Sequence, residues 1–169
     1  MRDFDDNEFP RAYLITFRCY GTWLHGDERG SYRRSSKAIG GVVHIPPRPR
    51  LKIAELDHLR HRPARLTKSQ RWVVEEAIRD VCEHRTYLLR AINVRTNHVH
   101  TVVSALKAPE PILEAFKSYS TRALRKNGLV GKNVTPWARH GSTIYLWKEE
   151  DVAKAVEYVV FGQDHPFSR

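Results

Sequence analysis

The sequence predicts an α+β protein of the ferredoxin-like type, with helices packed on one small antiparallel sheet. Two observations favour this class. Segments rich in aromatic and β-branched residues interleave with segments that keep helical spacing of apolar side chains, and no internal repeat interrupts the series. The 169 residues fit one domain, so we expect a single domain over 1–169 with a basic loop insertion at about 32–65.

The N-terminal part predicts one strand followed by a long loop. Residues 12–24, AYLITFRCYGTWL, have the composition of a strand, and a turn cluster containing Gly26 and Gly30 follows. Residues 32–65 are basic and poorly periodic, as in RRSSK and PPRPR. They predict a loop with one short strand at GVVHI, 41–45.

The middle of the chain predicts a helix and a hairpin. Thr67, with Gln70 three residues later, forms a capping-box pattern at the start of TKSQRWVVEEAIRDVC, whose apolar residues then keep helical spacing. YLLRAINVR (87–95) and HVHTVVSA (98–105) have the pattern of two adjacent strands joined by a turn at 96–97.

The C-terminal part predicts a helix, a strand and a second helix. PEPILEAFKSYSTRALRKNG (109–128) is opened by prolines and closed by Asn-Gly. GSTIYLW (141–147) is typical of a short strand. KEEDVAKAVEYVVFGQ (148–163) has acidic residues in its first turn, where they complement the helix dipole.

The charge of the chain indicates a nucleic-acid partner. Lys and Arg number 29 against 19 Asp and Glu, a net charge of +10, although a merely basic surface is an equal alternative. No apolar run approaches the ~18 residues that span a bilayer, and the acidic N-terminus lacks a secretory pattern, so we expect a cytoplasmic protein without a membrane partner. Cys19 and Cys82 are expected to be buried thiols.

His98 and His100 form the first candidate site. Residues i and i+2 of a strand project from the same face, so the two imidazoles lie side by side and can share one divalent ion. An incidental polar pair on a wet sheet face is the alternative, because a lone His-x-His is a weak motif. A basic protein with such a pair suggests phosphoryl transfer, in which a metal polarises the phosphate and a side chain attacks.

Two of the seven tyrosines lie on predicted helices, and their angular positions differ. Tyr119 lies within the apolar stripe of the first of these helices, which predicts a core aromatic. Tyr158 projects about 130° from the centre of its helix's stripe, which includes Val159 and Val160. It is therefore the candidate nucleophile, with an ordinary surface tyrosine as the alternative.

These features together resemble the HUH-type single-tyrosine transposases, the enzymes of small insertion sequences and their REP-associated relatives. The similarity runs through the chain: AYLITFRCYGTW resembles the family's first strand, NVRTNHVHTVV its histidine strand, AFKSYSTRALRK its basic helix and AVEYVVFGQ its catalytic helix. Only the 32–65 region has no counterpart. The resemblance implies the same α+β ferredoxin-like fold.

The resemblance also implies a mechanism and a partner. His98 and His100 would hold Mg²⁺ or Mn²⁺, and Tyr158 would cut single-stranded DNA, expected to contain a hairpin, through a covalent 5′-phosphotyrosine intermediate. A 3′-OH would then displace the tyrosine and rejoin the strands. The family includes homodimers, in which the tyrosine serves the partner's histidines, and monomers, and the sequence favours neither arrangement.

The third metal ligand departs from the family pattern. The glutamine often follows the tyrosine by four residues, about 40° around a helix, but Gln163 follows Tyr158 by five, about 140°. Gly162 offers a way to end the helix and turn the chain back. Gln163 is the expected ligand and Asp164 the alternative.

Two groups of basic residues are candidate DNA contacts. Four lie on the 109–128 helix, outside its predicted apolar stripe: Lys117, Arg122, Arg125 and Lys126. Arg33 and Arg34, beside Tyr32 in the basic loop, could bind single strands by charge and stacking. A solvated basic face is an equal alternative for the helix.

Two other functions compete with the nuclease. A non-catalytic or domesticated nucleic-acid-binding module on the same sheet would bind DNA after chelation of metal and would not cut it. A structural Zn²⁺ site would need two further strong ligands close to the histidine pair, which the sequence does not provide.

Overall fold

The structure, a computed structural model, describes residues 9–28, 31–34 and 42–162. It divides the chain into two compact units, one formed by Met1–Cys19 with Arg65–Arg169 and the other by Tyr20–Ala64. Within the described residues, no helix is long and apolar enough to cross a membrane.

A four-stranded antiparallel sheet forms the centre of the first unit. It contains β1 (Ala12–Cys19), β4 (Leu88–Val94), β5 (His98–Ser104) and β6 (Trp137–Leu146), in the order β4-β5-β1-β6. With the helices between these strands, this order gives the βαββαβ topology of ferredoxin-like folds. The predicted fold class is confirmed.

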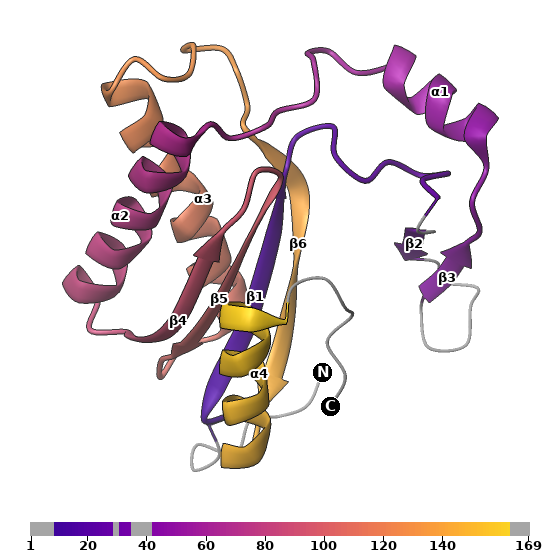
Figure 1. The fold of residues 1–169 in the computed structure, drawn as a ribbon. Helices are drawn as coiled ribbons and strands as arrows, with labels where there is room; N and C mark the ends of the chain where they lie inside the picture. The colour runs from indigo at the N-terminus through magenta and orange to yellow at the C-terminus, as the bar shows by residue number, and fades with distance from the viewer. Residues whose placement is uncertain (1–8, 29–30, 35–41, 163–169) are drawn as a thin grey trace. The chain divides into compact units, whose positions relative to one another are not determined.

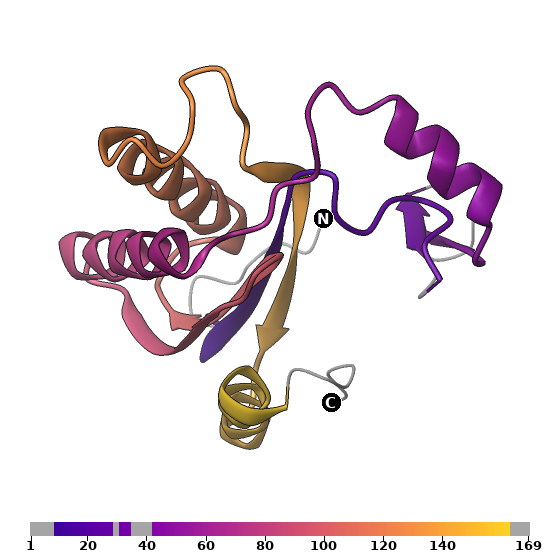
Figure 2. The ribbon, with the colours of Figure 1, turned by 45° about the horizontal axis from the view of Figure 1, so that its top comes forward.

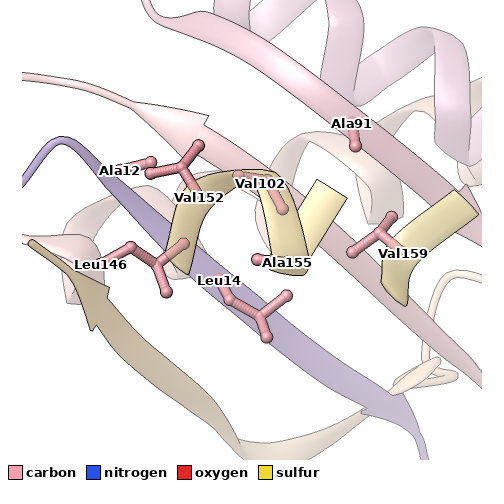
Figure 3. Packing of buried hydrophobic residues seen from close by; sticks show 8 residues of the cluster. All are labelled: Ala12, Leu14, Ala91, Val102, Leu146, Val152, Ala155 and Val159. Atoms are coloured by element: carbon pink, nitrogen blue, oxygen red, sulfur yellow. The ribbon is translucent and has the colours of Figure 1, made fainter. Parts of the chain in front are cut away.

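Helices cover both faces of this sheet. The two crossover helices, α2 (Lys68–His84) and α3 (Pro109–Lys126), lie on one face, and α4 (Glu149–Phe161) lies on the other (Figures 1 and 2). The core beneath α4 consists of small and branched side chains from all four strands and the helix (Figure 3): Ala12, Leu14, Ala91, Val102, Leu146, Val152, Ala155 and Val159.

Strand β1 has both faces covered for most of its length. Ala12 and Leu14 pack under α4, whereas the odd-numbered residues of the strand point to the other face. On that face Phe17 makes an edge contact with Trp137, at 4.9 Å between ring centroids. This explains the nearly continuous apolar sequence of β1. Only Thr16 and Arg18 interrupt it, and both fall on the face that carries α4.

The predicted helices and hairpin are present. Thr67 caps α2: its Oγ1 accepts a hydrogen bond from the Gln70 backbone N–H at 3.3 Å, and the Gln70 side chain accepts one from Thr67 N–H at 2.8 Å. This capping box satisfies two donors that a helix start otherwise leaves unpaired. Helix α3 ends before Gly128, whose φ of +68° suits glycine.

Element boundaries and two helix faces differ from the predictions. Strand β1 ends at Cys19, five residues before the predicted end, and β6 begins at Trp137, four residues before the predicted start. On α4, Val160 is 45% exposed and does not belong to the buried stripe. Tyr158, roughly 90° from the centre of the observed stripe, is half-buried and packs against the edge of the core.

On α3, two side chains lie opposite to expectation. Lys117 is buried at 7% exposure, so its predicted position outside the buried face is wrong. Its ammonium donates hydrogen bonds to the carbonyls of Ala138 and Arg139 at 3.1 and 3.0 Å. Tyr119, the predicted core aromatic, is only half-buried, with the Arg122 guanidinium 4.8 Å above its ring.

The second unit contains more regular structure than the predicted loop. The expected strand is present as β3 (Val42–Ile45), and it pairs with an unpredicted β2 (Ser31–Arg34). An unpredicted helix, α1 (Pro49–Asp57), has no buried residue, so it shows no apolar periodicity in the sequence. Within this unit the buried Asp27 carboxylate pairs with the Lys52 ammonium at 3.2 Å.

Candidate active site

The two histidines project from β5 toward the face that α4 covers. His100 pairs in register with Thr16 on β1, and His98 pairs with Arg18. Val99 and Thr101, between and after them, are fully buried on the opposite face. The imidazole centroids of His98 and His100 are 4.7 Å apart with the rings at 75°. The structure therefore brings the predicted pair together.

Each imidazole is oriented through Nδ1. His98 Nδ1 donates a hydrogen bond to Asn97 Oδ1 at 2.7 Å, and His100 Nδ1 shares one with Thr16 Oγ1 at 2.7 Å. Such contacts on one ring nitrogen leave Nε2 as the nitrogen that coordinates a metal, and they hold the ring in one orientation. Both rings are thus arranged as metal-binding histidines usually are.

The electrostatics keep His100 uncharged. Burial, followed by the positive charges of His98, Arg18 and Arg95, lowers the pKa of His100 to about 3. A neutral imidazole is the form that coordinates a metal. His100 therefore does not need to lose a proton before it binds a metal ion at neutral pH.

Tyr158 lies beside this pair in the same chain. Its ring centroid is 5.4 Å from that of His100, and the rings cross at 76°. Burial raises the pKa of the phenol, and the charge of Arg18 opposes the shift. The last turn of α4 is tied to the hairpin by Asn93, whose Nδ2 donates to the Val159 carbonyl at 3.0 Å.

The residues present fit part of a divalent metal site. Two imidazoles on one face, with Nε2 available for coordination, suit transition metals such as Mn²⁺ better than they suit Mg²⁺. In the part of the chain that the structure describes, no three His, Cys, Asp or Glu side chains cluster as a metal site. The expected third ligand, Gln163, and its alternative, Asp164, lie outside the described residues.

The six predicted DNA-binding residues belong to two elements, α3 and β2. Lys117 is buried beneath β6, whereas Arg122 and Lys126 are exposed on α3. Arg125 is also exposed, and its guanidinium donates to the Val134 carbonyl at 3.2 Å. These four residues of α3 lie on the side of the sheet opposite His98 and His100. Arg33 and Arg34 are placed in β2 of the second unit.

Three residues of the site were not predicted from the sequence: Thr16, Arg18 and Asn93. The signal for two of them is present in AYLITFRC, where polar residues at 16 and 18 repeat the two-residue spacing of the histidines. That Thr16 and Arg18 lie opposite the two histidines follows only from the β1–β5 register, which cannot be predicted from the sequence. Asn93 lies opposite His100 on β4.

The fold and this geometry define a protein with a two-histidine, one-tyrosine site on a ferredoxin-like sheet. The family model for IS200-like transposases matches residues 58–153, more than half of the chain. The chain belongs to the IS200-like transposase family, which confirms the predicted relationship. The match includes the histidine hairpin and ends five residues before Tyr158.

Two solved structures share the fold. One is a REP-associated tyrosine transposase bound to a REP hairpin, with a TM-score of 0.53 and 12% identity over 97% of this chain and 73% of that one. The other is a candidate transposase from Deinococcus radiodurans R1, with a TM-score of 0.53 and 12% identity over 99% of this chain and 100% of that one. Comparison with curated proteins gave no significant match.

Proposed function

We propose that this transposase is a metal-dependent single-stranded DNA endonuclease and strand transferase that uses Tyr158 as its nucleophile. The observation that carries the proposal is the position of the Tyr158 ring, 5.4 Å from His100 and on the same face as both histidines. A phenol at this place can reach a phosphate held against the histidine pair.

The proposed step is a transesterification. The Tyr158 oxygen attacks the scissile phosphorus and its proton passes to solvent, while the bond from phosphorus to the 3′-oxygen breaks and that oxygen takes up a proton. The products are a 5′-phosphotyrosine link and a free 3′-OH. A second 3′-OH reverses the step on a new strand, without ATP, because one ester bond replaces another.

His98 and His100 would hold Mg²⁺ or Mn²⁺ through Nε2, with Gln163 or Asp164 as the expected third ligand. The ion would supply polarisation of the phosphate and stabilisation of the developing charge. The protein residues hold the geometry: Thr16 orients the His100 ring, and Asn93 fixes the end of α4. Because burial raises the pKa of Tyr158, its phenol is protonated at neutral pH and depends on that charge stabilisation to react.

The proposed substrate is single-stranded DNA with a hairpin. The basic charge of the chain, +10, suits a polyanion. The REP-associated transposase that shares the fold was solved bound to a REP hairpin, which supports hairpin DNA as the substrate class here. A homodimer is not needed to bring His100 and Tyr158 together, since both belong to one chain.

The experiment is a covalent-adduct assay. The protein is incubated with 3′-labelled single-stranded hairpin oligonucleotides and Mn²⁺ or Mg²⁺, and a denaturing gel is read for label that migrates with the protein. We expect an adduct that EDTA abolishes and that Tyr158→Phe and His100→Ala both eliminate.

Tyr119→Phe is the matched control. Arg85 and Arg122 lower the pKa of Tyr119, so its phenol is the more acidic of the two helical tyrosines, but it lies on the α3 side of the sheet. The adduct should persist in Tyr119→Phe. An adduct that persists in Tyr158→Phe would show that the nucleophile is another residue. Metal-independent binding without any adduct would favour the non-catalytic binding module instead.

A further inference from the structure

We infer that Arg18 is a further catalytic residue, whose guanidinium binds the scissile phosphate between the histidine pair and Tyr158. This inference rests on the proposed function of the site. It adds a positive side chain from β1 to a site whose histidines come from β5 and whose tyrosine comes from α4.

Strand register places Arg18 at the site. Arg18 pairs with His98 in the same β1–β5 ladder in which Thr16 pairs with His100. The 2.7 Å hydrogen bond between Thr16 and His100 shows that the even-numbered side chains of both strands meet on one face. The side chain of Arg18 therefore leaves the sheet on that face, next to His98.

Arg18 lies beyond the part of β1 that belongs to the core under α4. Going along β1, this core includes Ala12 and Leu14. Thr16 follows at the level of the buried His100, and Arg18 follows at the level of His98. Both Arg18 and His98 are only half-buried, so part of each residue is exposed to solvent.

The sheet is irregular on the other side of Arg18. The β1–β6 register shifts between Phe17 and Cys19: Phe17 pairs with Gly141 and Cys19 with Trp137, so three residues of β6 stand opposite Arg18. Irregularities of this kind in a strand ladder are frequent next to active sites. Arg18 is consequently held in a regular ladder toward β5 and in a distorted one toward β6.

A guanidinium suits this role chemically. In phosphoryl transfer the non-bridging oxygens carry the negative charge of the transition state, and stabilising that charge is a main source of catalysis. Arginine offers two parallel N–H donors to two phosphate oxygens and stays charged at any pH at which DNA is handled. Lysine can supply the charge but not the paired donors.

Three variants test the inference by single-turnover adduct formation at saturating DNA and Mn²⁺. We expect Arg18→Ala to slow the reaction by about 100-fold, as the loss of one transition-state donor does in other enzymes. Arg18→Lys should recover part of the rate, and added guanidinium ion should accelerate Arg18→Ala. Arg95→Ala, which removes the same charge from the exposed turn, should react at close to the wild-type rate.

Binding and folding are measured in parallel. DNA affinity in EDTA and the Mn²⁺ concentration for half-maximal rate should change far less than the rate in Arg18→Ala, and circular dichroism should show a folded protein. A wild-type rate in Arg18→Ala, or equal losses of rate in Arg18→Ala and Arg95→Ala, would overturn the inference about Arg18 and leave the proposed function standing. Absence of an adduct with the wild type, or its persistence in Tyr158→Phe, would overturn the proposed function and this inference with it.

Discussion

Lys117 and Arg122 are five residues apart on α3, and only Arg122 is exposed to meet DNA. The ammonium of Lys117 lies beneath β6, an edge strand that has no neighbour on its outer side in the described sheet. It donates to two carbonyls there, and burial lowers the pKa of its ammonium. A lysine in this position satisfies backbone acceptors of the sheet edge, so its role is structural.

Cys19 gives a prediction on alkaline stability. The thiol is fully buried, and burial raises its pKa from 9.0 to about 12. The unfolded thiol ionises above pH 9 while the folded one stays protonated, so its contribution to stability is complete below pH 9 and is lost as the pH rises toward 12. Urea unfolding at pH 7 to 11 should show about 1 kcal/mol less stability at pH 10 from this group.

The comparison with Cys19→Ala isolates that contribution. The wild type and the variant share all other titrating groups, including Tyr13, whose pKa burial raises to about 12. The difference between their free energies of unfolding should therefore be constant below pH 9 and shrink above it. Cys82→Ala, where the pKa of the thiol is raised to about 11, should behave alike. A difference that stays constant to pH 11 would contradict the prediction.

At the scale of elements, the docking of α4 determines where Tyr158 lies. The helix packs through Val152, Ala155 and Val159, which are small or branched, and Asn93 adds a hydrogen bond at its C-terminal end. Carbonyls of the last helical turn lack intrahelical partners, and Asn93 satisfies the one at Val159. Asn93 also lies opposite His100 in the β4–β5 ladder, so this one residue connects the end of α4 to the strands that carry the histidines.

Asn93→Leu should loosen the last turn of α4. Leucine keeps a similar volume but donates no hydrogen bond, and a bond of this kind contributes about 1 kcal/mol. Amide hydrogen exchange should therefore be about fivefold faster in the C-terminal turn of α4, where Gly162 N–H donates to Tyr158. The exchange of α2 should not change.

Asn127→Leu is the control for that experiment. Asn127 also donates from Nδ2 to a carbonyl near a helix end, that of Ala123 at 2.8 Å, but within its own helix α3 on the other face of the sheet. It should affect α3 and leave α4 unchanged. Equal exchange in the Asn93 variant and the wild type would mean that apolar packing alone holds the helix.

The sequence could predict the elements that bury a face. Helices α2, α3 and α4 each show the periodicity of one covered side, and the β4–β5 hairpin has the composition of two strands joined by a turn, so all were predicted. Helix α1 buries no residue and leaves no periodic signal, and β2 has the polar sequence SYRR, whereas the equally short β3 has the β-branched sequence VVHI. The predicted boundary of a strand was wrong where the strand continues past its apolar part, as β6 does toward Trp137.

The candidate site was predictable only where its residues are close in sequence or share one helix. The histidine pair follows from two-residue spacing, and Tyr158 follows from its helical angle. Thr16 and Arg18 depend on strand pairing over long separations, such as the 84 residues between Thr16 and His100, and Asn93 depends on its contact with Val159, 66 residues away. No local pattern reports such a pairing.

At the scale of the whole molecule, positive charge is concentrated in the second unit. Residues 20–64 contain nine Lys and Arg against four Asp and Glu, a net of +5 and half of the chain's total of +10. Four arginines of this unit are described with exposed side chains: Arg48, Arg50, Arg60 and Arg62. This distribution predicts that the unit contributes to DNA binding through phosphates.

Salt dependence measures that contribution. In EDTA, the association constant for a single-stranded hairpin should fall with NaCl, and the double variant Arg60→Ala with Arg62→Ala should reduce the log–log slope by about 1.4, because each phosphate contact on a single strand contributes about 0.7. Arg79→Ala on α2, whose guanidinium pairs with Glu75 at 2.6 Å, should leave the slope unchanged. Equal slopes in all three proteins would place the phosphate contacts outside the second unit.

The pairing of β4 with β5 has a further consequence for how such a site changes over time. His98 and His100 share one face with α4, and Val99 and Thr101 fill the core on the other. One residue added to the connection between these strands would shift the register and exchange the two sets, placing imidazoles in the core and valine and threonine beside Tyr158. The length of the hairpin connection is thus as important to the candidate site as the histidines themselves, and we expect an insertion there to inactivate the transposase without replacing any side chain of the site.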